Sequence, residues 1–170
     1  MNPDIIMVIV RLTLGTIMVY HGWPKVQNLK RNARDFEGKG FAPGLLWGTI
    51  VGLVEFVGGI TILVGVYPEI GAGLFAFQML VGTIWKLKKR KPFIDYSYDI
   101  QLLALCLVLS GLGPDSHVFV TLGPVLLLNW SVALAAVVAA IAMVYLPGIL
   151  GLGLEDVHEA LGWIPNDTNS

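Results

Sequence analysis

Charged residues are scarce in this chain of 170 residues: they make up 14% of it, whereas ordinary soluble domains carry about a quarter. The single cysteine, Cys106, excludes an intrachain disulfide, a CxxC redox pair and a thiolate zinc site. The formal net charge is -1, so the positive excess typical of nucleic-acid-binding proteins is missing. These shortages argue against a soluble domain and against a nucleic-acid partner.

Motifs for nucleotides, metals and hydrolysis are missing as well. The sequence has no GxGxxG motif, no P-loop, no nucleophile elbow and no HExxH zinc motif. The three histidines are expected at different depths: His21 at the end of an apolar stretch, His117 in a loop and His158 near the C-terminus. They therefore do not predict a haem or metal site.

Apolar residues dominate, at 55% of the chain, and the mean hydropathy is +0.73. A membrane span needs about 20 apolar residues, and hydrocarbon favours helices because it offers backbone groups no partner. We therefore predict an all-α fold, a polytopic transmembrane helix bundle with four core helices and a fifth span. The apolar stretches are 5–23, 45–66, 68–85, 100–112 and 124–145, of which 100–112 is short and needs residues 96–99 as an extension.

The apolar stretches divide the chain into three parts. Residues 1–117 are predicted to form the four-helix transmembrane core, and residues 118–150 the fifth transmembrane helix. Residues 151–170 are predicted to be a short tail with an amphipathic helix over Leu154–Trp163. No basic residue precedes the first stretch and Arg11 interrupts it, so we expect a permanent span rather than a cleaved signal peptide.

Ten of the eleven lysines and arginines lie in two clusters, one between the first two stretches and one between the third and fourth. Because basic loops stay on the cytoplasmic side, we predict a multi-pass protein of the cell membrane with its N-terminus outside and with loops 24–44 and 86–99 cytoplasmic. Residues 27–36 show helical spacing and are expected to form a short surface helix. The clusters either determine topology alone or also bind anionic lipid or an acidic soluble subunit.

Arg11 and Glu55 are the charged residues that lie deep within the apolar stretches. A charge at membrane depth costs at least about 2.5–3.5 kcal/mol on insertion scales, so such residues usually face the bundle and pair. Counting about 1.5 Å per residue from the outer ends places Arg11 about 9 Å deep and Glu55 about 16 Å deep. We therefore predict an Arg11–Glu55 ion pair, which either locks two helices together or serves ligand binding or proton handling.

Small residues share the faces of these two charges. On the first helix Arg11, Gly15, Gly22 and Lys25 lie in one direction, and on the second a stripe of glycines lies with Glu55. Glycine lets membrane helices approach closely. The predicted packing glycines are Gly15, Gly22, Gly48, Gly52 and Gly59.

Other polar residues are weaker candidates for a cavity. Gln78 shares a face with Gly82 on the third helix, and Asp99, Cys106 and Ser110 share a face of the fourth. Each is also explained by an ordinary interhelical hydrogen bond. The candidate ligand-binding residues are Arg11, His21, Lys25, Glu55 and Gln78.

Four segments together resemble the DoxX family of small integral membrane proteins: residues 11–15, 21–25, the stretch 52–59 with its glutamate and double glycine, and the end of the fourth stretch at 111–116. The resemblance covers about residues 5–117, and in it Arg11, His21, Lys25 and Glu55 match polar motif positions. The family is usually a four-helix bundle. It includes the membrane subunit of a thiosulfate:quinone oxidoreductase and proteins linked to oxidative-stress complexes.

Three functions follow as hypotheses. The resemblance implies a membrane subunit of a quinone-linked oxidoreductase, with quinone as the cofactor and with electrons from a redox partner subunit, because no electron carrier of its own is visible. The first alternative is a non-catalytic scaffold for soluble partners, alone or as a homo-oligomer. The second is a small-solute transporter, which the short chain and the lack of an inverted repeat disfavour.

Overall fold

The computed structural model describes residues 3–112, 115–121 and 130–149, and all regular structure within them is helical. The predicted amphipathic segment Leu154–Trp163 and the start of the predicted fifth span lie outside the described residues. The helices are α1 Pro3–Gln27, α2 Leu29–Gly38, α3 Gly44–Val64, α4 Pro68–Lys88, α5 Phe93–Leu112 and α6 Trp130–Ile149.

Four helices, α1, α3, α4 and α5, are long and apolar enough to cross a membrane, which confirms the predicted bundle. The fourth apolar stretch is extended beyond its expected length, because α5 begins at Phe93 and runs for 20 residues. In α6 the apolar segment Leu134–Leu146 is shorter than a span within the described residues. The expected surface helix is α2, displaced by two residues.

Local sequence explains where the helices end. Asn28 caps α2 by accepting a hydrogen bond from the backbone of Arg31 at 3.1 Å. Gly65 ends α3 in the left-handed region with φ 78°, a conformation that costs glycine little. Pro68 then opens α4 at a position where its missing N–H leaves no bond unmade.

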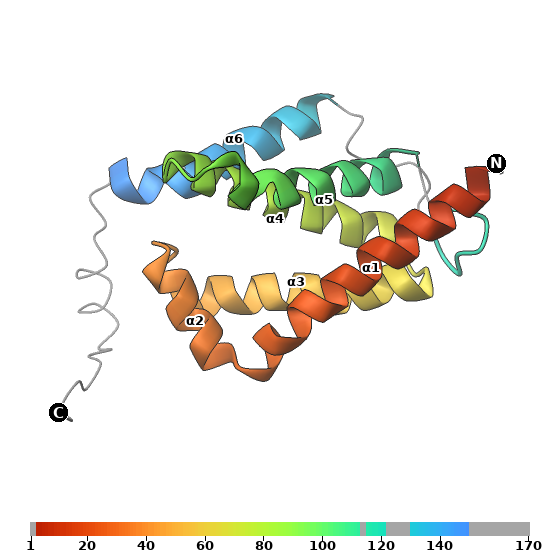
Figure 1. Cartoon of the computed structure of the whole chain (residues 1–170), viewed down its shortest axis with the longest axis horizontal. Coiled ribbons are helices and arrows are strands. Elements are labelled where there is room, and N and C mark those ends of the chain that lie inside the picture. Colours follow the sequence, from red (N-terminus) through yellow and green to blue (C-terminus); the bar gives the residue numbers. More distant parts are fainter. Residues whose placement is uncertain (1–2, 113–114, 122–129, 150–170) are drawn as a thin grey trace.

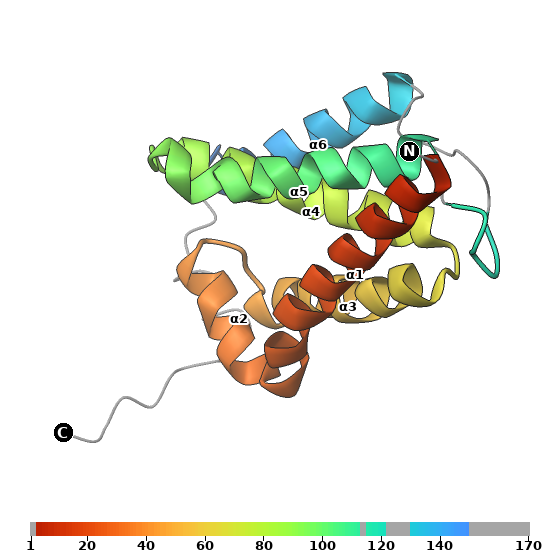
Figure 2. The same ribbon diagram turned by 45° about the vertical axis from the view of Figure 1, so that its right-hand side comes forward.

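The helices form two pairs. α1 packs on α3, α4 packs on α5, α2 covers one end of α3 and α6 lies on α4. The pairs meet at the turn between α3 and α4, and α3 and α4 diverge from that turn (Figures 1 and 2). We call this the turn end, with residues 65–67 and 115–121. The opposite end of the bundle contains α2 and the connection 89–92. We call it the basic end, because both clusters of basic residues lie there.

Glycines set the close contact and the register of α1 against α3. A Cβ on Gly59 would lie 2.8 Å from the backbone nitrogen of Val19, and one on Gly15 would lie 3.0 Å from the carbonyl oxygen of Gly59. Gly22 lies directly against the backbone of Phe56 in the same way. Side chains at these glycines would separate the two helices.

The same contacts show that α1 is shifted toward the turn end relative to α3. The C-terminal part of α1 reaches only Gly52, where a Cβ would lie 3.2 Å from the Cβ of Lys25. The rest of α3 is covered by α2, where Asn32 donates a hydrogen bond to the carbonyl oxygen of Gly48 at 2.6 Å. Lys25 therefore lies eight residues, about 12 Å, inside the basic end of α3 at Gly44.

Buried side chains between the four long helices make the main core. Apolar side chains from all four converge there, and Cys106 is one of them. Its fully buried members include Leu14, Met18, Ile62, Ala72, Cys106 and Leu109.

Candidate functional site

Glu55 lies at the centre of a polar cluster formed by three helices. Its carboxylate, with 4% of the side chain exposed, accepts hydrogen bonds at both oxygens from the ammonium group of Lys25 on α1. Gln78 on α4 donates its amide nitrogen to the same carboxylate. We call these three residues the Glu55 cluster. It is a polar bridge between the two helix pairs, near the middle of α3 and of α4.

The amide oxygen of Gln78 is buried and has no hydrogen-bond partner among the described residues. The reason is chemical: an ionised carboxylate only accepts, so Gln78 must turn its nitrogen toward Glu55 and its oxygen away. A buried acceptor left without a partner costs about 1–3 kcal/mol. The Glu55 cluster therefore holds a charge, a donor group and a free acceptor in one place.

The Glu55 cluster is not sealed. The side chain of Lys25 is 31% exposed, although its partner Glu55 is almost fully buried. The lysine stem passes over Gly52, which has no side chain to block it. A molecule approaching from the Lys25 side could therefore reach the cluster without unfolding a helix.

The predicted Arg11–Glu55 ion pair is wrong. Arg11 donates from Nε to Asp115 at 2.8 Å and from Nη1 to the carbonyl oxygens of Ile62 and Leu63 at 3.1 and 2.7 Å. Because α1 is shifted toward the turn end, Arg11 lies level with Ile62, which is seven residues and about 10 Å along α3 from Glu55. The same shift brings Lys25 to Glu55 instead.

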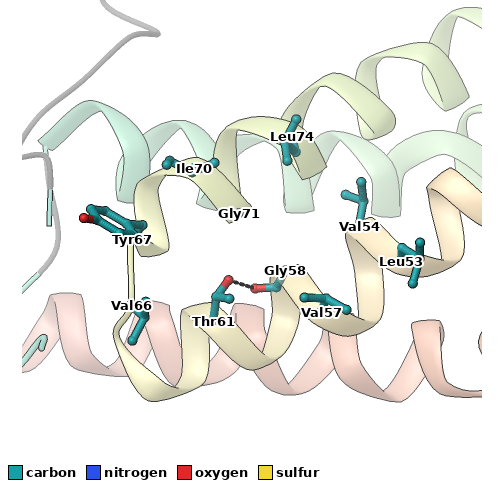
Figure 3. A pocket seen from close by; sticks show the side chains of 10 residues that line it. All are labelled: Leu53, Val54, Val57, Gly58, Thr61, Val66, Tyr67, Ile70, Gly71 and Leu74. Atoms are coloured by element: carbon teal, nitrogen blue, oxygen red, sulfur yellow. Dashed lines mark hydrogen bonds between the residues drawn. The ribbon is translucent and has the colours of Figure 1, made fainter. Parts of the chain in front are cut away.

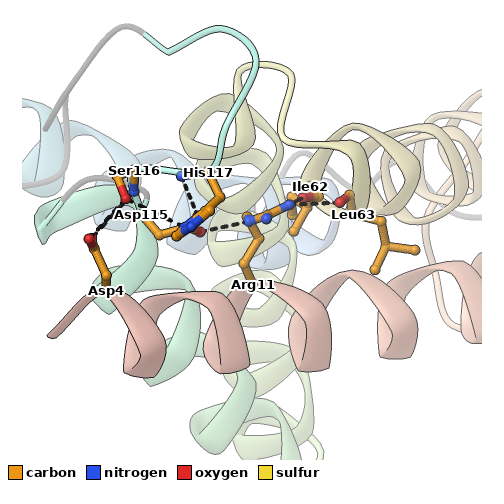
Figure 4. A network of polar contacts seen from close by, with 7 residues as sticks. All are labelled: Asp4, Arg11, Ile62, Leu63, Asp115, Ser116 and His117. Atoms are coloured by element: carbon orange, nitrogen blue, oxygen red, sulfur yellow. Dashed lines mark hydrogen bonds and ion pairs between the residues drawn. The ribbon is translucent and has the colours of Figure 1, made fainter. Parts of the chain in front are cut away.

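Asp115 is the centre of a second polar cluster, which we call the turn-end cluster (Figure 4). It consists of Asp4, Arg11, Asp115, Ser116 and His117. The side chain of Asp115 is fully buried, and besides Arg11 it binds the backbone nitrogen of His117 at 2.9 Å. Burial acts to raise the pKa of Asp115, but the hydrogen bonds from Arg11 and His117 and the guanidinium charge outweigh it, so the pKa lies below its ordinary value. The hydroxyl of Ser116 in the same segment donates a hydrogen bond to the carboxylate of Asp4 at 2.8 Å. The cluster joins α1 to the chain after α5.

An apolar groove lies on the outer face between α3 and α4, with a volume of about 460 Å³ (Figure 3). Two of its side chains carry a hydroxyl, Thr61 and Tyr67, and that of Thr61 already donates to the carbonyl oxygen of Gly58 at 2.8 Å. The lining residues are Leu53, Val54, Val57, Gly58, Thr61, Val66, Tyr67, Ile70, Gly71 and Leu74.

Comparison with known proteins gives a family for the part of the chain that holds the Glu55 cluster. The sequence model of the DoxX family matches residues 6–87. This segment belongs to the DoxX family. The match contains α3 whole and almost all of α1 and α4, and so it contains Lys25, Glu55 and Gln78. Asp115, the partner of Arg11, lies beyond it.

One curated relative of this chain is the Bacillus subtilis (strain 168) protein named "Putative oxidoreductase CatD". The two are 27% identical over 117 residues, which cover 65% of this chain and 85% of the relative. No solved structure matches the chain.

Of the five candidate residues, the structure brings three together and separates two. Lys25, Glu55 and Gln78 form the Glu55 cluster, while Arg11 is at the turn end. His21 is exposed beside α5, where the hydroxyl of Tyr98 lies 3.4 Å from its Nε2. Within the described residues, no group of three or more histidine, cysteine or acidic side chains could hold a metal ion.

A third ion pair lies nearer the basic end. Lys86 on α4 contacts Asp99 on α5 at 2.7 Å and also donates to the carbonyl oxygen of Asp95 at 3.0 Å. Gly82 leaves room for this pair, since a Cβ there would lie 3.2 Å from Asp99 Oδ2. Burial lowers the pKa of the nearby Lys39, and the positive charge of Lys25 lowers it further. The basic end thus holds the Lys86–Asp99 pair near other cations.

Two features of the site escaped sequence reasoning. Asp115 follows the fourth apolar stretch, and nothing local indicates that its loop folds back onto α1. Lys25 was expected in a cytoplasmic loop, although it shares the helical face of Gly22 and Arg11. That shared face is the signal which could have placed it in the bundle. Cys106 and Ser110 do not line a polar cavity: Cys106 belongs to the apolar core, and Ser110 donates to its carbonyl oxygen.

Proposed function

We propose that this chain is the membrane subunit of an oxidoreductase and binds a quinone at the Glu55 cluster. One observation carries the proposal: beside the ion pair of Lys25 with the buried Glu55, the Gln78 amide oxygen is buried and lacks a partner among the described residues. A ligand hydroxyl would satisfy this acceptor. The name of the Bacillus subtilis relative supports an oxidoreductase.

The residues of the cluster fit such a ligand. A quinone supplies two carbonyl oxygens, which become hydroxyl groups when it takes up two electrons and two protons. Lys25 has three N–H donors, two of which can remain on Glu55 while the third turns to a carbonyl. Gln78 offers its oxygen to a hydroxyl, and Glu55 can exchange a proton. Since the sequence shows no electron carrier, a partner subunit supplies the electrons.

The orientation in the membrane is part of this proposal. Lysines and arginines concentrate at the basic end, and such clusters stay on the cytoplasmic side of the cell membrane. The basic end would then face the cytoplasm and the turn end the outside. Lys25 would lie on the cytoplasmic half of the bundle, where protons reach the Glu55 cluster from that side.

Quinone binding by the purified full chain in lipid nanodiscs tests the proposal. Gln78→Leu should weaken binding of a reduced quinone (a quinol, which has the hydroxyl that Gln78 accepts) with one isoprene unit about fivefold, the size of one hydrogen bond of about 1 kcal/mol. Gln101→Leu is the matched control, because Gln101 is an exposed glutamine on α5 far along the chain from the cluster. Equal effects of the two substitutions, or no binding by the wild-type chain, would refute quinone binding at this cluster.

The surface of α2 favours a second candidate, a scaffold for an acidic soluble subunit. This helix buries Asn32 and Ala33 against α3 and exposes Lys30, Arg31 and Arg34. Reversing Arg31 and Arg34 to glutamate should then release a co-purifying acidic subunit while quinone affinity stays unchanged. A chain that binds no quinone but loses its partner on this reversal is a scaffold.

A further inference from the structure

We propose that the apolar groove between α3 and α4 holds the isoprenoid tail of the molecule whose head group binds the Glu55 cluster. This inference rests on the proposed function and adds where the tail of the ligand lies. It makes the ligand a long-tailed membrane quinone rather than a small water-soluble one.

The chemistry of the groove suits an isoprenoid chain. All its side chains are apolar except Thr61 and Tyr67, and the Thr61 hydroxyl is already bonded within α3. Leu53, Val57 and Leu74 are each about half exposed, so the groove opens to the lipid side of the bundle. The groove therefore offers mainly apolar packing surface, and packing is the interaction by which a hydrocarbon tail binds protein within a bilayer.

The position of the groove connects it to the Glu55 cluster. Its residue nearest the basic end on α4, Leu74, lies one turn before Gln78 on the same helical face. On α3, Leu53 and Val54 lie within one turn of Glu55 along the helix axis, although they point to a different face. The groove therefore extends along the bundle to the level of the Glu55 cluster, and a chain lying in it would bring its head group to that level.

The shape and size of the groove follow from two glycines. A Cβ on Gly71 would lie 3.0 Å from the carbonyl oxygen of Gly58, so α3 and α4 touch there without side chains between them. Beyond this contact the helices diverge toward the basic end (Figure 1). A volume of 460 Å³ is about three times that of a cavity that binds benzene, enough for about 18 carbons or three to four isoprene units.

Tail length is the variable that tests the inference. Affinities for quinones with one and with four isoprene units are measured in the same nanodiscs, for the wild type and for Val57→Trp and Leu74→Trp, which fill the groove. Comparing each variant with the wild type cancels the partitioning of the long quinone into lipid. Ile60→Trp is the control, because Ile60 is an exposed residue of α3 outside the groove.

We expect both groove variants to weaken the four-unit quinone about tenfold, or about 1.4 kcal/mol, and the one-unit quinone by less than about twofold. The control should change neither affinity. If the variants affect both quinones equally or affect neither, the tail does not lie in the groove, although the head-group site stands. If the wild type binds no quinone of either length, the proposed function itself fails.

Discussion

The pairing of Arg11 with Asp115 can be tested directly against the pairing with Glu55 that the sequence favoured. Arg11→Met removes three hydrogen bonds and leaves the carboxylate of Asp115 buried, with none of its side chain exposed. Removing one partner of a buried ion pair costs about 3–5 kcal/mol. Since the arginine is also 93% buried by side-chain area, we expect the upper part of that range.

A double-mutant cycle isolates the pair from the other bonds. Arg11→Met and Asp115→Asn are made singly and together, and the free energy of unfolding is measured by denaturant titration of the purified chain in detergent micelles. Hydrogen bonds to charged groups contribute about 1.5–3 kcal/mol, so the Arg11–Asp115 coupling should fall in that range. Arg11→Lys should recover part of the loss, because one ammonium cannot match the planar guanidinium fork.

The control cycle combines Arg11→Met with Glu55→Gln. The structure separates these residues by about 10 Å along α3, with no shared partner, so their effects should add within about 0.5 kcal/mol. A coupling above about 1 kcal/mol in this cycle, together with none in the Arg11–Asp115 cycle, would refute the register of α1 against α3 described above.

Three further predictions use the same unfolding measurement. Because the folded-state pKa of Asp115 is lowered, its stabilisation is complete above its unfolded pKa of about 3.9 and is lost as the pH falls through the folded value. Asp115→Asn should remove this acid-side loss, and an unchanged pH profile would contradict the assignment. Gly22→Val should destabilise the chain by more than about 2 kcal/mol, because the new side chain meets the backbone of α3, whereas Gly38→Val, with open space around it, should change little. Glu55→Leu alone should cost about 3 kcal/mol by leaving both the Lys25 ammonium and the Gln78 amide without their acceptor, and Lys25→Met added to it should restore the part of the loss that is due to Lys25. A double variant as unstable as the single one would show that the pair itself is required.

Much of the fold could be predicted because it depends on local properties of the chain. Membrane helices need long apolar stretches and defined ends, and both are visible in the order of residues: Gly65 and Pro68 mark the turn between α3 and α4. The glycines expected at helix contacts lie where α1 meets α3, since a face of small residues can be counted along one helix. The start of α5 was missed because polar residues precede its apolar stretch.

The partners of the charged residues depend on how the helices slide against one another. Apolar lengths suggested that α1 and α3 end at the same level, but α1 runs past α3 at the turn end and stops short at the basic end, where α2 takes its place. That shift moves Arg11 away from Glu55 and brings Lys25 to it. No count along a single helix contains this information.

The sequence by itself therefore determined that the chain is a bundle of membrane-length helices, and it showed which helix faces carry small residues. It also determined that the buried charges must find partners, because hydrocarbon solvates neither charges nor free backbone groups. Only the tertiary structure decided which partners they find. Interhelical register is set by glycine-to-backbone contacts between segments more than thirty residues apart, and by the chain after α5 folding back to place Asp115 beside Arg11.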